Sequence, residues 1–340
     1  LNPRVDVPLT YQYNASIQYE FLRNWVLDVA YVSSHGTKLM NSYRNINLAH
    51  LATPENPING QTANTSANVG LRVPHIGYQP TGLGGTYFDG SSNYHSLQAT
   101  VRKAFSYGLA LQASYTFSKN LTTLGAGDSS NSNDPLDLDQ QYGPTGWNRP
   151  HRFIMNYQYE LPFGTHQGAK GKLLNGWSVF GVTTIQNGLP LTFTDSQVGT
   201  IYGVSGGRAQ MCEGATYASI PTSGSVRERL GGASGGSGYI NKDAFCAPPT
   251  GGIYGNGTGW GNSGIGIARG PGQFNWDISI IKNTPIREGH TFQFRTEFYN
   301  AFNHPQFGNP DTGLRNSTFG QINGTTVNPR IIQFGFKYIF

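Results

Sequence analysis

The stretch RIIQFGFKYIF, residues 330–340, places a large apolar side chain at every second position up to the end of the chain. Successive side chains of a β-strand point to opposite faces, so one face holds Ile332, Phe334, Phe336, Tyr338 and Phe340. About eleven residues exceed an ordinary soluble strand and match a tilted strand that crosses the hydrocarbon of a bilayer. The stretch therefore predicts a strand of a membrane wall.

The same two-residue period recurs along the chain. It is found in Tyr11–Phe21, Trp25–Ser34, Tyr94–Phe105, Leu109–Lys119, His151–Leu161, less cleanly in Trp177–Phe193, from Trp276 onward, and in Phe292–Phe302. With the terminal stretch these make about nine strands. The intervening segments alternate short and long, including a long polar segment over about Gly36–Asn93. A soluble β-sandwich would also alternate, but it has no reason for this regularity of connections.

These features predict the fold class. We expect an all-β fold, the antiparallel portion of a transmembrane β-barrel with about nine long strands, short periplasmic turns and long extracellular loops. The stripe Phe292, Phe294, Phe298, Phe302 is expected to face lipid. The opposite face of the strands, which lines the lumen of a barrel, is expected to carry the charged residues Glu20, Asp28, Arg102, Arg152, Glu160, Asp277, Arg295 and Glu297.

Composition excludes several function classes. Hydrophobic residues make up 37% and charged residues 12% of the 340, and no stretch approaches the roughly 18 apolar residues of a spanning helix. The net charge of +5 comes from scattered lysines and arginines, so no nucleic-acid interface is expected. The first residues, LNPR, show no secretion signal, and we expect the sequence to be part of a longer chain.

Four stretches go beyond a generic barrel pattern: YHSLQATVRK (94–103), LQASYTFSK (111–119), NRPHRF (148–153) and FYNAFNHPQF (298–307). Together with the terminal Phe340, they resemble the C-terminal barrel region of TonB-dependent outer-membrane receptors. The likeness is strongest to the Oar-like type, which has a carboxypeptidase-regulatory-like N-terminal domain. It covers nearly the whole chain.

The resemblance implies a receptor of the bacterial outer membrane. Such a receptor imports a nutrient ligand (an iron chelate, an oligosaccharide or a peptide) with energy that the TonB system passes through a plug inside the barrel. It implies that residues 1–340 are the C-terminal part of the barrel, with the plug and the N-terminal strands absent. It also implies that the barrel-assembly machinery reads the terminal aromatic residues, here Phe336, Tyr338 and Phe340.

Two alternatives to a transporter remain. The first is a structural or adhesive surface protein that uses the barrel as a scaffold for its loops. The second, an enzyme, is disfavoured: Gly203–Gly207 matches G-x-S-x-G but lacks the strand, helix and partner groups of a nucleophile elbow. The loop aspartates Asp128, Asp134, Asp137 and Asp139 lack the order of a calcium loop, so neither a metal nor a cofactor is expected.

The long loops contain aromatic residues beside Gly and Asn. Trp147, Tyr254 and Trp260 are candidate contacts for an extracellular small ligand, because such rings stack on sugars or pack on a partner. Packing of the loops on themselves explains the same residues equally well.

The open ends of the predicted sheet give a further expectation. Tyr11–Phe21 and Arg330–Phe340 both run toward the periplasm, so pairing them would make a parallel seam, which bacterial barrels avoid. We therefore expect an open, curved sheet with these two strands at its edges.

We predict that Cys212 and Cys246 form a disulfide, because they are the two cysteines of the chain and lie in one external loop, where disulfides persist. Closing a loop of about 34 residues stabilises the fold by roughly 3–4 kcal/mol on the chain-entropy estimate. Labelling of free thiols in the unreduced protein tests the pairing, and two reactive thiols would refute it.

Overall fold

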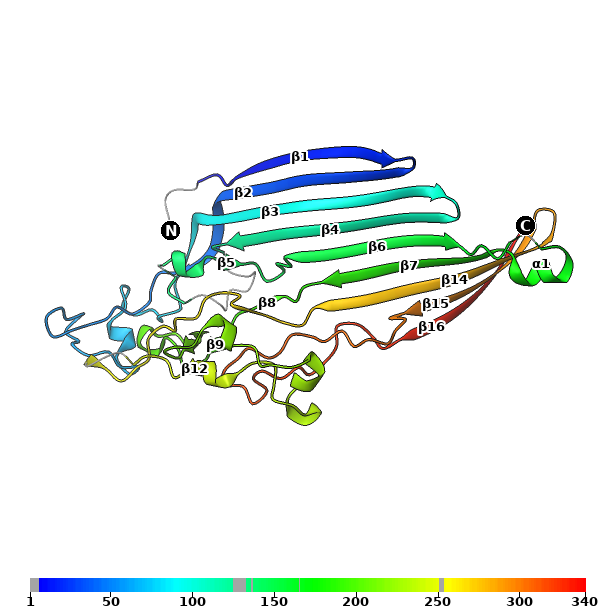
Figure 1. Cartoon of the computed structure of the whole chain (residues 1–340). Helices are drawn as coiled ribbons and strands as arrows, with labels where there is room; N and C mark the ends of the chain where they lie inside the picture. Colours follow the sequence, from blue (N-terminus) through cyan, green and yellow to red (C-terminus); the bar gives the residue numbers. More distant parts are fainter. Residues whose placement is uncertain (1–5, 125–132, 136, 165, 251–253) are drawn as a thin grey trace.

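The computed structural model describes residues 6–124, 133–135, 137–164, 166–250 and 254–340. Figure 1 shows a wall of long strands with a mass of loops at one end, and short turns with one helix, α1 (Gly168–Leu174), at the other. Four long segments of chain, 46–83, 123–150, 187–272 and 300–330, connect strands at the loop end.

The wall is one antiparallel sheet in which each long strand pairs with the next along the chain (Figure 1). The described part of the chain contributes nine such strands, as the sequence predicts: β1 (Leu9–Leu22), β2 (Trp25–Asn45), β3 (Gly84–Ser106), β4 (Leu109–Thr122), β6 (His151–Glu160), β7 (Trp177–Gln186), β14 (Gln273–Arg287), β15 (His290–Tyr299) and β16 (Ile331–Ile339). The short β5 (Gly143–Pro144) adds to the end of β4.

Short elements make up the loops. The strands are β8 (Pro190–Leu191), β9 (Thr194–Asp195), β10 (Gly207–Arg208), β11 (Gln210–Met211), β12 (Phe245–Cys246) and β13 (Ala268–Arg269). The 3-10 turns are Val69–Leu71, Asp139–Gln141, Thr200–Tyr202, Tyr217–Ser219, Val226–Arg229, Gly232–Ser234 and Lys242–Ala244.

The register of the sheet assigns each side chain to one of two faces. Between β15 and β16, Phe292 lies opposite Tyr338, and Phe294 lies opposite Phe336. The rings of Phe294 and Phe336 are 5.1 Å apart between centroids, so aromatic residues form a continuous ladder on this face. The alternate residues, among them Glu297, point to the other face.

The edges of the sheet are open, as expected from the strand directions. Among the described residues no hydrogen-bonded pair joins β1 to β16, and the two strands are the first and last of the order. Every residue of β1 is exposed. An unpaired strand edge in hydrocarbon leaves backbone groups without partners, each at a cost of several kcal/mol.

Three boundaries differ from the sequence prediction. The segment expected as loop from Gly36 to Asn93 is partly strand: β2 and β3 stay paired to Asn45 and Gly84, through three register shifts beyond Gly36. Bulges of this kind erase the two-residue period while the backbone remains hydrogen bonded.

The other two boundaries lie at strand ends. β7 ends at Gln186 and not at Phe193, because the chain bends at Gly188, where any Cβ would overlap the carbonyl group of Gly270. β15 ends at Tyr299, and Asn300 has a φ of 50°, so Phe302 lies beyond the strand that was expected to contain it.

The long loops fold together into a cap with its own hydrophobic core. Phe193 and Ile220 are fully buried there, and Leu314 and Ile322 from the segment between β15 and β16 join the same cluster. The cap therefore unites the segments 187–272 and 300–330, which lie side by side at the loop end in Figure 1.

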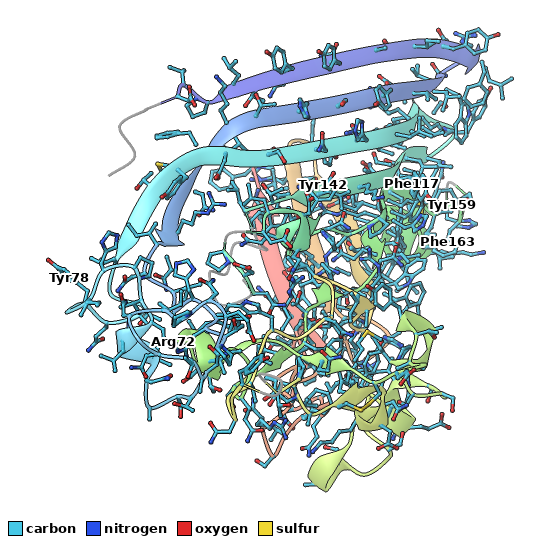
Figure 2. The ribbon with its side chains drawn as sticks, turned by 90° about the vertical axis from the view of Figure 1, so that its left-hand side faces the viewer. Arg72, Tyr78, Phe117, Tyr142, Tyr159 and Phe163 are labelled. Atoms are coloured by element: carbon cyan, nitrogen blue, oxygen red, sulfur yellow. A yellow bond between two sulfur atoms is a disulfide. The ribbon has the colours of Figure 1, made fainter. Side chains whose placement is uncertain are left out.

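A buried arginine joins the first long loop to this cap. Arg72 is fully buried, and its guanidinium donates to the carbonyl oxygens of His50, Thr65 and Ile201 at 2.5, 3.2 and 2.8 Å. Figure 2 shows Arg72 among the loops, below the arch of strands. Burial lowers the pKa of Arg72, and the nearby Tyr202 opposes this effect. Because Ile201 belongs to the 187–272 segment, Arg72 connects two separate loops.

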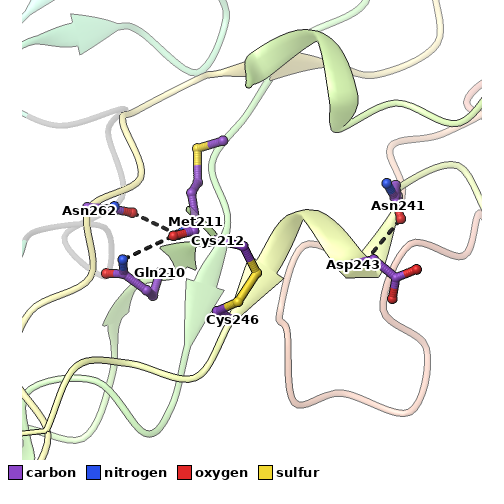
Figure 3. The surroundings of a disulfide bond; sticks show 7 residues. All are labelled: Gln210, Met211, Cys212, Asn241, Asp243, Cys246 and Asn262. Atoms are coloured by element: carbon purple, nitrogen blue, oxygen red, sulfur yellow. Dashed lines mark hydrogen bonds between the residues drawn. A yellow bond between two sulfur atoms is a disulfide. The ribbon is translucent and has the colours of Figure 1, made fainter. Parts of the chain in front are cut away.

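The disulfide belongs to the same cap, and Figure 3 shows its surroundings. β11 pairs antiparallel with β12, which puts the Cα atoms of Cys212 and Cys246 at 4.9 Å, and a bond joins the two sulfur atoms. The Met211 N–H donates to Asn262 Oδ1 at 2.7 Å beside it (Figure 3). The structure therefore contains the pairing that the cysteine positions predict.

We predict that Phe294→Arg lowers the yield of folded protein in lipid vesicles, at a cost of about 2–4 kcal/mol near the bilayer midplane. The matched control is Gln293→Arg, because Gln293 is the neighbour in sequence but lies on the opposite face, where it donates to Asn283 Oδ1 at 2.9 Å. Equal loss of folded protein for the two variants would contradict the assignment of the aromatic face to lipid.

We also predict that Arg72→Ala loosens the cap and leaves the wall intact. The substitution leaves several buried carbonyl groups unpaired, and we expect a loss of about 2–4 kcal/mol on the cost of such groups. Limited proteolysis should show faster cleavage in the loops, while the folded wall keeps its mobility on a gel without heating. Arg23→Ala, at an exposed turn at the other end of the wall, is the control.

Candidate functional site

The concave face of the wall is the first candidate site. Residues of eight strands line a hollow of about 840 Å³ on this face. Its polar side chains come from alternating positions and include Gln18, Glu20, Arg102, Gln112, Asn156, Gln158, Asp277, Ser279 and Glu297. Their alternation with the lipid-facing aromatic residues follows from the period of two. The predicted lumen residues Glu20, Arg102, Asp277 and Glu297 are thus brought to one surface.

The charges on this face are partly paired within the wall. Arg295 Nη1 lies 3.3 Å from Glu297 Oε1, and the Tyr299 hydroxyl donates to Glu297 Oε2 at 3.3 Å. Asp277 accepts from the backbone N–H of Asn300 at 2.8 Å and from Asn275 Nδ2 at 3.0 Å. These residues place charged and amide groups on the concave face beside apolar ones such as Phe180 and Val182, and the charged groups suit water or another polar surface.

A second hollow, of about 450 Å³, lies in the loop cap above the wall, and we call it the loop pocket. It is lined by residues from five separate stretches of the chain: Asn45, Leu48, Thr81, Asn133, Pro135, Thr194, Asp195, Ser196, Val204, Ser205, Gly206, Gly207 and Trp260. Its walls combine one large aromatic ring with hydroxyl, amide and backbone groups, a set that suits polar ligands with apolar faces.

An ion pair fixes one side of the loop pocket. Arg315 donates to both oxygens of Asp195, from Nε at 2.9 Å and from Nη2 at 2.8 Å. The hydrogen bonds to Asp195 raise the pKa of Arg315 against the opposing effect of burial. The Asp195 side chain is fully buried, so it acts as a fixed structural anion.

The aromatic side of the pocket is Trp260. Its ring stacks on Tyr202, with centroids 4.7 Å apart and an interplanar angle of 5°. Burial raises the pKa of Tyr202, the charge of Asp134 acts in the same direction, and Arg72 opposes both. Trp260 is therefore held in place by the cap while it borders the hollow.

The other two candidate loop residues lie elsewhere. Trp147 is 65% exposed and does not line the loop pocket. Tyr254 also lies outside the lining, and its carbonyl oxygen accepts from the backbone N–H of Asn64. The structure thus brings Trp260 to a pocket and leaves Trp147 and Tyr254 apart from it.

Sequence reasoning missed Asp195, Arg315 and Tyr202. Asp195 and Arg315 are 120 positions apart. Asp195 lies two residues beyond the less cleanly alternating stretch Trp177–Phe193, and Arg315 lies in a glycine-containing segment with no period. No signal within the sequence pairs them, because the pairing arises from the folding of two loops against each other.

The remaining motifs do not form a catalytic or metal site in the part of the chain that the structure describes. Ser205 of the G-x-S-x-G match lines the loop pocket, but a 3-10 turn precedes it and β10 follows it, in place of a strand and a helix. No group of three or more His, Cys, Asp or Glu among the described residues is arranged to hold a metal ion. Asp128 lies outside the described residues.

The terminal aromatic residues are accessible. Phe336, Tyr338 and Phe340 are 69%, 51% and 88% exposed, at the end of the wall that carries the short turns. No described helix is long and apolar enough to cross a membrane.

The wall and loops resemble several solved outer-membrane receptors. The ferric preacinetobactin receptor BauA of Acinetobacter baumannii has a TM-score of 0.44 at 8% identity, over 97% of this chain and 29% of that one. The transporter YddB of Escherichia coli has 0.44 at 10% identity, over 98% and 32%. The pyoverdine receptor FpvA of Pseudomonas aeruginosa has 0.42 at 11% identity, over 98% and 30%. The chain spans about a third or less of the length of these receptors.

No curated protein matches the sequence. A family model described as an outer membrane beta barrel domain matches residues 1–333, nearly the whole chain. The match agrees with the antiparallel wall, its lipid-facing aromatic residues and its alternation of short turns and long loops. The long loops are thus extracellular, the short turns are periplasmic, and the wall spans the bacterial outer membrane. The chain belongs to the outer membrane beta barrel domain family.

Proposed function

We propose that this chain is the C-terminal wall of a TonB-dependent receptor, of the Oar-like type, that takes up a nutrient ligand. The observation that carries the proposal is the concave face, where charged and amide side chains of six strands line one hollow below the loop cap. An inward polar face needs water or a polar partner, and a plug domain supplies such a partner. The four sequence stretches that resemble these receptors support the same function.

Within this proposal, the plug and the N-terminal strands belong to the preceding part of a longer chain. Those strands supply the partners of β1 and β16, whose edges are open in the described sheet. The plug contacts the TonB system, and Phe336, Tyr338 and Phe340 form the signal for the barrel-assembly machinery. The receptor is not an enzyme and uses no cofactor.

The loop pocket is the proposed point of first contact for the ligand, which is an iron chelate, an oligosaccharide or a peptide. Trp260 supplies an aromatic surface at the border of the hollow, and the surrounding hydroxyl and amide groups supply hydrogen bonds. The bidentate pair of Arg315 and Asp195 holds one side rigid, which lowers the entropy cost of binding.

A specific observation favours the second candidate, a structural or adhesive surface protein. The cap has its own buried core and a disulfide, so it is a folded surface element in its own right. On this alternative, the loops bind a partner at the cell surface and nothing passes through the wall.

Uptake by cells that express the full-length protein distinguishes the two functions. Radiolabelled ferric chelate, oligosaccharide and peptide are supplied in turn to cells that contain the protein, cells that lack it and cells that lack TonB. We expect one class of ligand to enter only when both the protein and TonB are present. Unchanged uptake of all three classes in both deletion strains would refute the proposal.

Variants of the loop pocket sharpen this test. We expect Trp260→Ala to reduce uptake about tenfold, because stacking contacts of this size contribute about 1–1.5 kcal/mol. Trp260→Phe keeps a ring against Tyr202 and should retain more activity. Trp147→Ala, outside the pocket, is the control and should leave uptake unchanged.

A further inference from the structure

An aromatic hollow lies on the lipid-facing side of the wall, at the extracellular end of β14. Phe274 and Trp276 occupy alternate positions to Asp277 and Ser279, so they point away from the concave face. The hollow has a volume of about 330 Å³ and is lined by Phe274, Trp276, Asn300, Phe302, Asn303, His304 and Pro305. We call it the aromatic cup.

The cup is built from rings that meet edge to face. The Trp276 ring centroid is 6.0 Å from that of Phe274 and 5.8 Å from that of Phe302, with interplanar angles of 79° and 81°. Phe302 is 66% exposed. The buried Trp276 Nε1–H has no hydrogen-bond partner among the described residues. The cup is therefore an apolar surface at the level where aromatic belts meet lipid headgroups.

A second hollow, of about 420 Å³, adjoins the cup and shares Asn300, Asn303 and Pro305 with it. Arg227 lines this second hollow. Arg330 lies at the shared border, because its backbone N–H donates to Asn303 Oδ1 at 3.0 Å and its Nη1 donates to the Ala301 carbonyl at 3.3 Å.

Neither arginine forms an ion pair with a carboxylate among the described residues. In the described part of the chain, no hydrogen bond or ion pair engages the exposed Arg227 guanidinium, and Arg330 uses one of its donors. The carboxylate next in sequence, Glu228, accepts at Oε2 from the backbone N–H and the hydroxyl of Ser225, both at 2.8 Å, and forms no ion pair with Arg227. An anion at this border would meet the guanidinium of Arg227 and the remaining donors of Arg330.

We propose that the aromatic cup and the adjoining hollow bind one phosphate-bearing glycolipid of the outer leaflet. An acyl chain occupies the cup, and the phosphate lies between Arg227 and Arg330. The placement follows from charge complementarity at a membrane interface, where basic pockets hold anionic headgroups. The exposed amide of Asn328, beside Arg227 in the second hollow, faces the position of the sugar. The lipid-binding proposal does not rest on the uptake function proposed above. It requires only that the wall spans the outer membrane with its long loops outside.

The test is retention of lipid by the full-length protein, measured by native mass spectrometry after purification in mild detergent. The probes are bisphosphorylated lipid A, dephosphorylated lipid A and phosphatidylglycerol. We expect bisphosphorylated lipid A to be retained at least about tenfold better than the other two, because two arginines at the interface act on its phosphate. Millimolar inorganic phosphate should not displace it.

Variants locate the site. The double variant Arg227→Glu with Arg330→Glu should lose at least about tenfold in retention, and Phe302→Ala should lose about threefold. Arg287→Glu changes the charge at the periplasmic end of the same strand, β14, and should retain lipid like the unaltered protein. The substituted residues are exposed, and gel mobility without heating verifies that each variant is folded.

Several outcomes would overturn the proposal. Equal retention of phosphorylated and dephosphorylated lipid A would remove the role of the phosphate. Equal retention of phosphatidylglycerol would make the site one for any anionic lipid. Displacement by inorganic phosphate would identify a site for soluble anions, and full retention by the double arginine variant would place the lipid elsewhere on the wall.

Discussion

The structure depends on one constraint: backbone N–H and C=O groups inside a bilayer have no water and must pair with each other. The wall meets it by pairing every long strand with its neighbours in sequence, so the short turns must reverse the chain tightly. Asn24, Tyr107 and Gly108 adopt positive φ values of 69°, 50° and 75° at two such turns. The register shifts of β2 against β3 lie toward the extracellular end, beyond Gly36, where water can reach the backbone.

Once the strands pair, the period of two decides the environment of each side chain. Two lysines lie on the lipid-facing side, which is otherwise mainly apolar, and their hydrogen bonds show how the wall accommodates a charged group there. Lys103 donates to the carbonyl groups of Ser106 and Leu109 at 2.7 Å, beside the ring of Trp25. Lys282 donates to the Asn175 carbonyl at 2.6 Å, beside the ring of its strand partner Trp177. Both amines thus reach the carbonyl groups of periplasmic turns, and the apolar stems remain on the wall.

The cap lies in water, so its backbone polar groups are satisfied in a different way from those of the wall. It has few regular strands, so its polar backbone is satisfied by individual side chains, such as the guanidinium of Arg72 and the amide of Asn133, which donates to the Gly261 carbonyl at 2.6 Å. The disulfide between Cys212 and Cys246 constrains a segment that has many glycines and few regular strands. This organisation lets a loop pocket form between segments that are remote in sequence, while the wall below stays regular.

The sequence by itself determined the wall. In stretches such as Tyr11–Phe21 and Arg330–Phe340, alternation shows which side chains share the apolar face, because a strand has a fixed period of two. The length of these stretches indicates a membrane strand, because a bilayer requires a minimum length. The cysteine pair could also be predicted, since two cysteines in one external loop leave one pairing. Only the tertiary structure decided where the loop pocket and the aromatic cup form. The meeting of Asp195 with Arg315, the stacking of Trp260 on Tyr202 and the position of Phe302 beyond β15 depend on how irregular loops pack. Those loops carry no period, and their contacts join residues more than fifty positions apart, so no local pattern records them.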